Sequence, residues 1–307
     1  HNSEVAIVMK NSTSMPAPNE VELKLALPPT QIDALLHHPV LASTPPVQQQ
    51  LANAYCDAPA GDLAAARIAV RLRQLDSQVL QTVKTAGQGG GGLSSRQEWE
   101  WQVPDPSLDQ SALAALPPFQ NALADKIAAL RSPLSTDFPR RSWQLAWQGS
   151  KIELVLDEGE IVCGKARAPI CEVELELKAG DPEALWSLAA ELASQVPLRP
   201  SDSSKASRGN ALGRQQWPLP DAQHPAEWLH RATVALDAYH DSGDATHLIA
   251  AQQALATLAQ HPQLDSAARA DAEMLPKALD SAGMPTTAYG AAALNLARRF
   301  AYETALR

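Results

Sequence analysis

Charged residues recur at every second position in several short segments of this sequence. In the first of them, Glu20, Glu22 and Lys24 alternate with apolar residues. Successive side chains of a β-strand point to opposite faces, so this spacing predicts a strand with one charged face and one apolar face. Carboxylates in a row offer oxygen ligands to hard cations such as Mg²⁺ and Mn²⁺, and neighbouring Lys and Arg side chains can bind phosphate oxygens.

Three later segments, 68–73, 96–101 and 172–178, show the same period of two. A single charged face is usually only the solvated face of a strand, but the repetition favours a shared site. A sheet curled so that these faces meet would enclose a lumen rich in carboxylates and bases, suited to metal ions bound to a polyphosphate. Like charges side by side repel unless cations lie nearby, which strengthens this interpretation for the glutamate row. The charged positions of the three segments are Arg71, Arg73, Arg96, Glu98, Glu100, Glu172, Glu174 and Glu176.

The elements that must position these residues are mostly strands between Glu20 and about Lys178. A short helix is predicted near residues 30–38, and the glycine run 87–92 is typical of a hairpin tip. That run is not a Walker loop, because no Gly-Lys-Ser/Thr follows it. Further strands are predicted at 142–147 and 152–157, and a helix from Asp181 to about Gln195.

The chain changes character after this helix. The segment 197–220 is rich in Pro, Ser and Gly and is predicted to be a boundary. Residues from about 224 to 307 are rich in Ala and Leu, and Pro262, Pro276 and Pro285 divide this region into shorter segments. This pattern predicts a small bundle of three or four helices. No chemistry can be assigned to this bundle, and we expect it to pack on the curled sheet or to mediate self-association.

Composition excludes several classes of protein. The 307 residues are 45% apolar and 19% charged, as expected of a packed globular core. The net charge of −9 argues against general nucleic-acid binding, although a phosphate ligand remains compatible if the bases gather in one site. The sequence contains neither a membrane-length apolar run nor a signal-peptide pattern, and its three cysteines are sparse, so we expect a cytoplasmic protein.

Taken in order, the motifs ExExK, RxR, TxK, RxExE, DxG, ExExE and Ser-Lys resemble the CYTH, or triphosphate tunnel metalloenzyme, superfamily. The resemblance covers roughly residues 19–209, and segments 84–87, 157–159, 171–178 and 204–209 favour its bacterial inorganic triphosphatase branch. One departure is Tyr55-Cys-Asp-Ala-Pro59, which lacks the threonine and one aromatic residue of the usual pattern. The longer helical partner domain called CHAD cannot be assigned to the short C-terminal region.

The resemblance implies an α+β protein built on an eight-stranded antiparallel β-barrel, or tunnel, with flanking helices and a small C-terminal helical bundle. The expected organisation is a leader over 1–18, either disordered or left from cloning, a tunnel domain over 19–212 and the bundle over 213–307. The tunnel would bind a triphosphate and one or two ions of Mg²⁺ or Mn²⁺. The implied metal ligands are Glu20, Glu22, Glu172, Glu174 and Glu176.

The resemblance also implies the residues that would act on the substrate. For the pair at 140 and 141, strand alternation favours Arg140 as the inward side chain, because Arg141 shares the face of Trp143. The residues expected to take part in catalysis are Glu20, Glu22, Lys24, Glu174 and Glu176. The residues expected to bind substrate are Lys24, Arg71, Arg73, Lys84, Arg96, Glu98, Glu100, Arg140, Asp157, Lys205 and Arg208.

The implied activity is metal-dependent hydrolysis of inorganic triphosphate to pyrophosphate and phosphate. Two alternatives use the same scaffold, namely thiamine triphosphatase and class IV adenylate cyclase. A third is a non-catalytic polyphosphate-binding module, against which the many carboxylates argue. The expected partner is inorganic triphosphate or another triphosphate compound, with neither nucleic acid nor membrane, and with self-association through the C-terminal helices.

Overall fold

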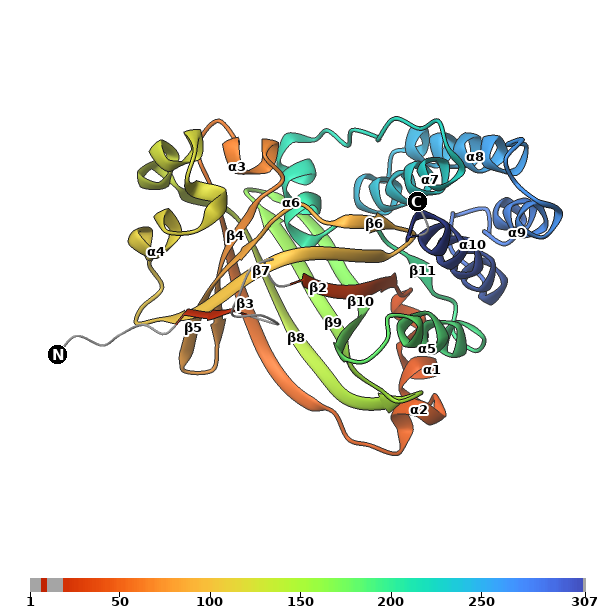
Figure 1. The fold of residues 1–307 in the computed structure, drawn as a ribbon, viewed down its shortest axis with the longest axis horizontal. Coiled ribbons are helices and arrows are strands. Elements are labelled where there is room, and N and C mark those ends of the chain that lie inside the picture. Colours follow the sequence, from red (N-terminus) through yellow and green to blue (C-terminus); the bar gives the residue numbers. More distant parts are fainter. Residues whose placement is uncertain (1–6, 10–18, 306–307) are drawn as a thin grey trace.

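The computed structural model describes residues 7–9 and 19–305. Its centre is an antiparallel sheet that closes on itself (Figure 1). The closed ring has the order β7-β5-β4-β3-β8-β9-β10-β2, and pairing between β2 and β7 completes it. The predicted eight-stranded antiparallel barrel in an α+β protein is therefore confirmed. The ring strands are β2 (Asn19–Ala26), β3 (Val47–Asp57), β4 (Ala69–Leu75), β5 (Gln78–Lys84), β7 (Leu93–Val103), β8 (Arg131–Trp147), β9 (Ser150–Cys163) and β10 (Ala166–Ala179).

Three short strands extend the sheet beyond the ring. β1 (Ile7–Met9) and β6 (Gln88–Gly90) pair with β7, and β11 (Arg199–Pro200) pairs with β2. The glycine run therefore forms a hairpin tip, as predicted, and the chain turns through Gly91 and Gly92 with φ angles of +62° and +96° that favour glycine. Apart from β1, the predicted leader over 1–18 lies outside the described residues.

Both faces of the barrel wall are buried at β2, which is why strand alternation separates charge from apolar bulk so cleanly there. On β2, Leu23 and Leu25 are fully buried in the hydrophobic core outside the ring. Glu20, Glu22 and Lys24 lie on the opposite, inner face and are also buried. Desolvated charges are costly unless they are paired, so the inner face must supply its own counter-ions.

The glycine of the DxG motif has a steric role in this wall. At Gly159 of β9, a Cβ atom would lie 2.3 Å from the carbonyl oxygen of Asp137 on β8. Only glycine allows the two strands to approach this closely. The close contact fixes the position of Asp157, two residues earlier on the same face of β9.

Helices cover the outer face of the barrel on two sides (Figure 1). Trp99 and Trp101 pack in one core cluster beneath α4 and the 3-10 helices, and Trp143 and Trp147 pack toward α5 in another. These four tryptophans therefore have a packing role outside the barrel. The helices before the boundary segment are η1 (Pro29–Gln31), α1 (Ile32–Leu36), α2 (Pro39–Ala42), α3 (Asp62–Ala65), α4 (Gln110–Ala114), η2 (Pro117–Phe119), η3 (Ala122–Ala129) and α5 (Glu183–Ala193).

The segment 197–220 is not the plain linker that its composition suggests. It contains β11 and a ten-residue helix, α6 (Lys205–Arg214), which lies beside β8, β9 and β10. The side chain of Ser204 caps this helix by accepting a hydrogen bond from the backbone N–H of Ser207. Lys205 therefore starts a helix and is buried, which the polar composition of the segment concealed.

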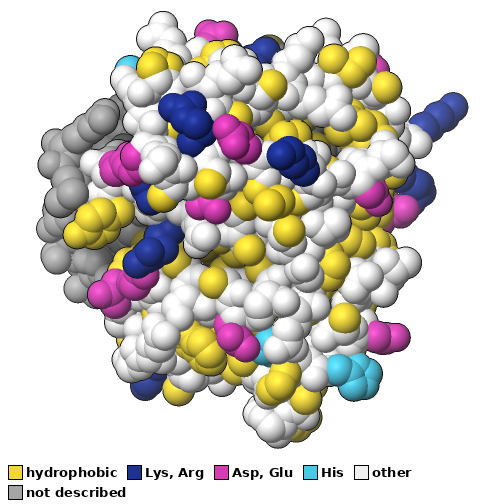
Figure 2. Space-filling view, turned by 90° about the vertical axis from the view of Figure 1, so that its right-hand side faces the viewer, with side chains coloured by type: hydrophobic (Ala, Val, Ile, Leu, Met, Phe, Trp, Pro, Cys, Tyr) yellow, Lys and Arg dark blue, Asp and Glu magenta, His cyan; other side chains and the backbone are white. Residues whose placement is uncertain are grey.

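The C-terminal region forms the predicted helical bundle, with four helices in the described residues. They are α7 (Pro225–Ser242), α8 (Ala245–Ala259), α9 (Ser266–Lys277) and α10 (Thr287–Ala305). Pro276 lies inside the last turn of α9, one residue before the helix ends. On the bundle side of the molecule, hydrophobic side chains lie among charged groups of both signs (Figure 2). Self-association through these helices stays a prediction.

The bundle and the barrel share one hydrophobic core. Its buried members include Leu23 and Val173 from the barrel wall together with Leu236, Leu255 and Leu296 from the bundle. Gly290 of α10 also approaches the backbone oxygen of Leu198 so closely that a Cβ atom there would lie 2.8 Å away. The expectation that the bundle packs on the barrel is therefore met by direct, close packing.

Candidate functional site

The barrel encloses a narrow cavity of about 80 Å³ lined almost entirely by polar side chains. These come from ring strands and from the N-terminus of α6, so residues far apart in sequence meet there. The motif residues that line this cavity, called the lumen below, are Glu20, Glu22, Lys24, Arg71, Arg73, Lys84, Arg96, Glu98, Arg140, Glu174, Glu176 and Lys205.

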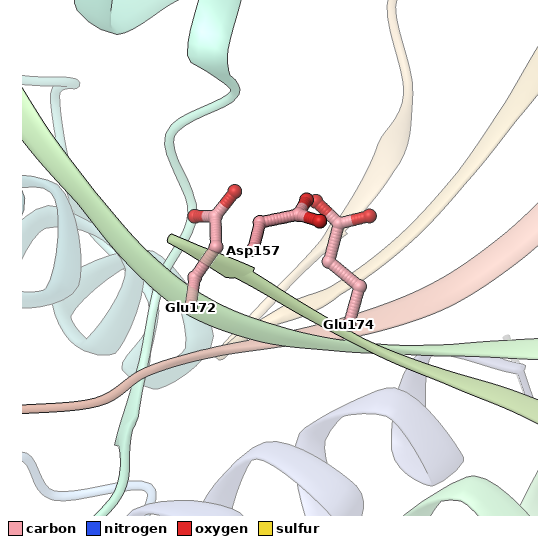
Figure 3. Close-up of side chains that lie close together, drawn as sticks. All are labelled: Asp157, Glu172 and Glu174. Carbon is pink, nitrogen blue, oxygen red and sulfur yellow. The ribbon is translucent and has the colours of Figure 1, made fainter. Parts of the chain in front are cut away.

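Three carboxylates converge at one side of the lumen (Figure 3). Asp157, Glu172 and Glu174 each offer an oxygen atom within 4.8 Å of the others. The ammonium group of Lys205 lies among them, 2.9 Å from Asp157, 2.5 Å from Glu172 and 3.2 Å from Glu174. This cluster, called the acidic cluster below, includes Asp157, which was predicted to bind substrate and was not among the predicted metal ligands.

Arg140 completes the surroundings of Asp157. Its Nε and Nη2 atoms donate to the two carboxylate oxygens of Asp157 at 2.8 and 2.9 Å, a forked geometry that fixes both side chains. Burial raises the pKa of Asp157, but Arg140 and Lys205 outweigh burial and lower it below its ordinary value. Asp157 is therefore ionised and fully buried. Arg141 points away and pairs with Glu158, as strand alternation predicted.

A second set of ion pairs crosses β2, β4, β5 and β7. Lys84 lies 3.1 Å from Glu20 and 3.8 Å from Glu98. Arg96 lies 3.9 Å from Glu22. On the neighbouring strands, Arg71 lies 3.6 Å from Glu100, and Thr82 donates to the same carboxylate at 2.9 Å. The two acidic residues of the RxExE motif, Glu98 and Glu100, thus form ion pairs with basic residues of the TxK and RxR motifs.

The electrostatics divide the lumen into two zones. In the first zone, burial, Glu174 and Glu20 raise the pKa of Glu22 to about 7, so Glu22 itself is short of positive charge. Lys205 and Lys24 instead lower the pKa of the neighbouring Glu174. In the second zone, burial, Arg71 and Arg140 lower the pKa of Arg73 to about 9, so Arg73 itself is short of negative charge. Acidic neighbours instead raise the pKa values of Arg71 and Arg140. The lumen therefore favours a cation in one zone and an anion in the other.

Four predicted site residues do not line the lumen cavity. Asp157 and Glu172 are buried behind it in the acidic cluster, and Glu100 supports Arg71. Arg208 lies on α6 and faces the bundle, where it forks onto Asp241 of α7 at 2.8 and 2.9 Å. Its distance to the nearest lumen-side carboxylate, Glu172, is 3.9 Å. The contact of Arg208 with substrate stays a prediction.

Two polar side chains on β3 belong to the site but were not predicted from the sequence. Tyr55 lines the lumen, and Arg73 donates to the Asn53 amide oxygen at 2.8 Å. Burial raises the pKa of the Tyr55 phenol, but Arg71, Lys205 and Arg73 outweigh burial and lower it. Alternation of Asn53 and Tyr55 along segment 47–57 was the available signal. It was obscured because both side chains are uncharged.

The fold and the lumen define the class of protein. The family model of the CYTH domain matches residues 18–209, and the chain belongs to this family. A curated relative, the inorganic triphosphatase of Haemophilus influenzae, is 36% identical over 202 residues that cover 64% of this chain. The chain spans 56% of that relative's length.

Solved structures give more distant likenesses. A putative adenylyl cyclase from Hippeastrum, described as having a dominant triphosphatase activity, is 21% identical with a TM-score of 0.49, covering 67% of this chain and 100% of its own. A protein from Pyrococcus horikoshii is 20% identical with a TM-score of 0.43, covering 61% of this chain and 96% of its own. These two likenesses are too distant to support an argument. None of the described helices is long and apolar enough to cross a membrane.

The residues present fit a divalent cation. Carboxylate oxygens are the ligands that Mg²⁺ and Mn²⁺ prefer. The acidic cluster already holds three carboxylates close enough together to contact one positive group, the ammonium of Lys205. The raised pKa of nearby Glu22 shows that further positive charge would be stabilising there. Acidic and basic side chains are equal in number among the predicted site residues, so a highly charged phosphate chain needs additional cations to enter.

Proposed function

We propose that this protein hydrolyses inorganic triphosphate to pyrophosphate and phosphate inside the lumen, with the help of Mg²⁺ or Mn²⁺. The observation that carries the proposal is the pairing of a cation-deficient zone at Glu22 with an anion-deficient zone at Arg73 in one narrow cavity. A metal–triphosphate complex has charges of both signs and would relieve both zones together. The family relationship and the triphosphatase relative support the same activity.

The basic zone binds and orients the phosphate chain in this proposal. Arg73, Arg71 and Arg140 approach from β4 and β8, and guanidinium groups can fork onto phosphate oxygens. Their positions are fixed by Asn53, Glu100 and Asp157. Preorganised positive charge stabilises the charge that develops on the transferred phosphoryl group, so positioning carries most of the catalysis.

The acidic zone has two tasks. Glu20, Glu22 and the carboxylates of Glu172, Glu174 and Glu176 would hold the metal. A carboxylate of this β10 row would also orient the attacking water and accept its proton. When bound, the divalent cation acts as a Lewis acid that polarises phosphate oxygens. Lys24, whose ammonium donates to the Ser203 carbonyl oxygen at 3.1 Å, would bind the phosphate chain between the zones.

Phosphate release tests the proposal. Inorganic triphosphate, ATP and thiamine triphosphate are each incubated with Mg²⁺, Mn²⁺ or a chelator, and released phosphate is measured over time. We expect fast release from inorganic triphosphate that requires the metal. Preferred turnover of thiamine triphosphate, or pyrophosphate release from ATP, would instead support one of the alternatives that use the same scaffold.

A matched pair of variants links the activity to the lumen. The double variant Glu20→Ala/Glu22→Ala removes carboxylates from the acidic zone and should lower turnover by roughly a hundredfold or more. The control is Glu160→Ala, which removes an exposed carboxylate at the far end of β9 and should leave turnover unchanged. Tight triphosphate binding without any turnover in the wild type would indicate a binding module.

A further inference from the structure

A second, larger cavity adjoins the lumen. It measures about 580 Å³ and lies between the barrel, the β6 hairpin, α6 and α7. Lys24, Lys84 and Arg96 line both cavities, so the lumen opens into this space at its basic residues. We call this larger cavity the vestibule. The bundle supplies one wall of it through α7, which gives the C-terminal region a place beside the site.

The walls of the vestibule are fixed by buried ion pairs. Asp237 of α7 pairs with Arg199 at 2.6 Å, and it also accepts the backbone N–H of Asp202 at 3.0 Å. Asp202 accepts the backbone N–H groups of Gly91 and Gly92 in the β6 hairpin at 3.1 and 2.6 Å. The tunnel base Lys24 joins this network, because its backbone N–H donates to the Gly92 carbonyl oxygen. The cavity is therefore built and not an accidental gap.

The acids that line the vestibule are already neutralised. Asp237 pairs with Arg199, Asp241 with Arg208, and Asp202 with His230 at 2.8 Å. The hydrogen bond to Asp202 raises the pKa of His230, which increases its positive charge near neutral pH. What remains to meet a ligand is an excess of positive charge.

Arg67 contributes the basic group best placed to meet such a ligand. It lines the vestibule, and its side chain has no carboxylate partner within the described part of the chain. It precedes β4, on which Ala69, Arg71 and Arg73 occupy alternate positions along the lumen. Its φ angle of +58° is uncommon for arginine and directs the chain away from a regular strand. The row of bases along the lumen thus continues into the vestibule.

We propose that the vestibule binds the fourth and further phosphate groups of a linear inorganic polyphosphate whose end lies in the lumen, and that Arg67 sets this preference for chain length. This inference rests on the proposed function, since it extends the same phosphate chain beyond the tunnel. A flexible polyanion fits the observations better than an organic group, because the acids in the cavity are paired while Arg67 and Lys24 have no carboxylate partner among the described residues. The N-terminus of α6, with Ser204 and Ala206 in both cavities, adds backbone dipoles of the same sign.

The test compares inorganic tetraphosphate with inorganic triphosphate on the full chain. Arg67→Asn removes the charge and keeps a residue type that tolerates the positive φ angle. We expect kcat/KM for tetraphosphate to fall about 5- to 20-fold, toward the low end for a lost charge-assisted hydrogen bond because Arg67 is exposed to solvent, while kcat/KM for triphosphate changes less than about twofold. Arg67→Lys keeps the charge and should retain most of the tetraphosphate activity.

Matched controls and a binding measurement separate the outcomes. Arg167→Gln removes an exposed arginine at the β9–β10 turn and should leave both substrates unaffected. Equal losses for triphosphate and tetraphosphate, or an unchanged kcat/KM for tetraphosphate, would overturn the proposal. If wild-type protein hydrolyses nothing, calorimetric binding of the two compounds in Mg²⁺ replaces kinetics, and selective weakening of tetraphosphate in Arg67→Asn still supports the vestibule. Binding of neither compound would overturn it.

Discussion

Lys205 lies where a metal ion would be expected. Its ammonium group contacts all three carboxylates of the acidic cluster and is almost completely buried. Those carboxylates raise the pKa of Lys205 well above its ordinary value, even though burial alone would lower it. A divalent cation bound at this cluster would therefore compete with Lys205 for the same oxygen atoms. We expect the phosphate chain to draw Lys205 away from the cluster, so that metal and substrate bind more tightly together than apart.

Replacement of this lysine tests the competition. Lys205→Met keeps the length of the side chain but removes its charge, so Mn²⁺ affinity without substrate should rise by roughly tenfold, while triphosphate affinity falls. Calorimetry measures both constants. Lys126→Met, which removes an exposed lysine that pairs with Asp62 outside the lumen, serves as the control. Unchanged Mn²⁺ affinity in Lys205→Met protein, with a native circular dichroism spectrum, would show that no competition exists.

At the residue scale, alternation along the strands was a good guide to which side chains face the lumen. It worked at Arg140, because a period of two distinguishes inward from outward positions without knowledge of the partners. It could not reveal that Asp157, Glu172 and Glu174 converge, since that depends on the register of β9 against β10. Nor could it assign Arg208, whose partner Asp241 lies 33 residues away on another helix.

At the scale of elements, α7 supports the site by holding two arginines. Asp237 and Asp241 lie one turn apart and bind Arg199 and Arg208, respectively. Asp241→Asn would leave the buried guanidinium of Arg208 without its carboxylate. We expect the free energy of unfolding to fall by about 2 kcal/mol, less than for a fully buried pair because Arg208 retains some solvent contact. Denaturation in guanidinium chloride measures the change.

An exposed ion pair supplies the comparison for Asp241. Arg298 and Glu183 form a pair in which both side chains are about half exposed. Glu183→Gln should change the free energy of unfolding by less than about 0.5 kcal/mol, because solvent screens such pairs. Equal effects of Glu183→Gln and Asp241→Asn would contradict the anchoring role of α7.

We expect His240 on α7 to make stability depend on pH. Burial, followed by the charge of Arg199, lowers its pKa to about 4. The unfolded chain has the ordinary value near 6.5, so on acidification the unfolded state takes up this proton first. The contribution of neutral His240 to stability is therefore complete above about pH 6.5 and is lost as the pH falls toward 4.

His240→Gln removes this titration and keeps a donor for the Gly283 carbonyl oxygen. Between pH 7 and pH 4.5 the wild type should lose roughly 1–2 kcal/mol more of its unfolding free energy than the variant, after discounting for partial exposure. Thermal unfolding at a series of pH values gives the two curves. Parallel curves would show that His240 titrates normally in the folded protein.

The elements also show where sequence patterns are insufficient. Composition identified segment 197–220 as a boundary, because Pro and Ser favour turns in isolation. Tertiary packing overrides that tendency at α6, where Leu212 is buried against Phe138 and Ile161. Ser204 is a residue type that favours helix N-caps, so the start of α6 could have been predicted. The apolar periodicity of residues 205–214 is too weak to predict the helix that follows.

At the scale of the whole molecule, barrel and bundle share one hydrophobic core, so we expect them to unfold as one cooperative unit. Truncation after Asn210 would expose buried residues of the shared core, and a fully buried Leu or Phe side chain contributes about 1.5–3 kcal/mol. We expect the truncated chain to lose cooperative unfolding and to aggregate, as judged by differential scanning calorimetry and light scattering. A soluble truncated barrel with an unchanged melting temperature would show that the two parts are independent.

The proposed function depends on cleavage of a phosphate chain in the lumen, and ³¹P nuclear magnetic resonance observes that reaction directly. Inorganic triphosphate is followed over time with the full chain, in Mg²⁺ and in chelator. We expect pyrophosphate and orthophosphate to appear in equal amounts, only when the metal is present. Triphosphate that stays intact in Mg²⁺, or cleavage that continues at the same rate in chelator, would contradict the proposed function.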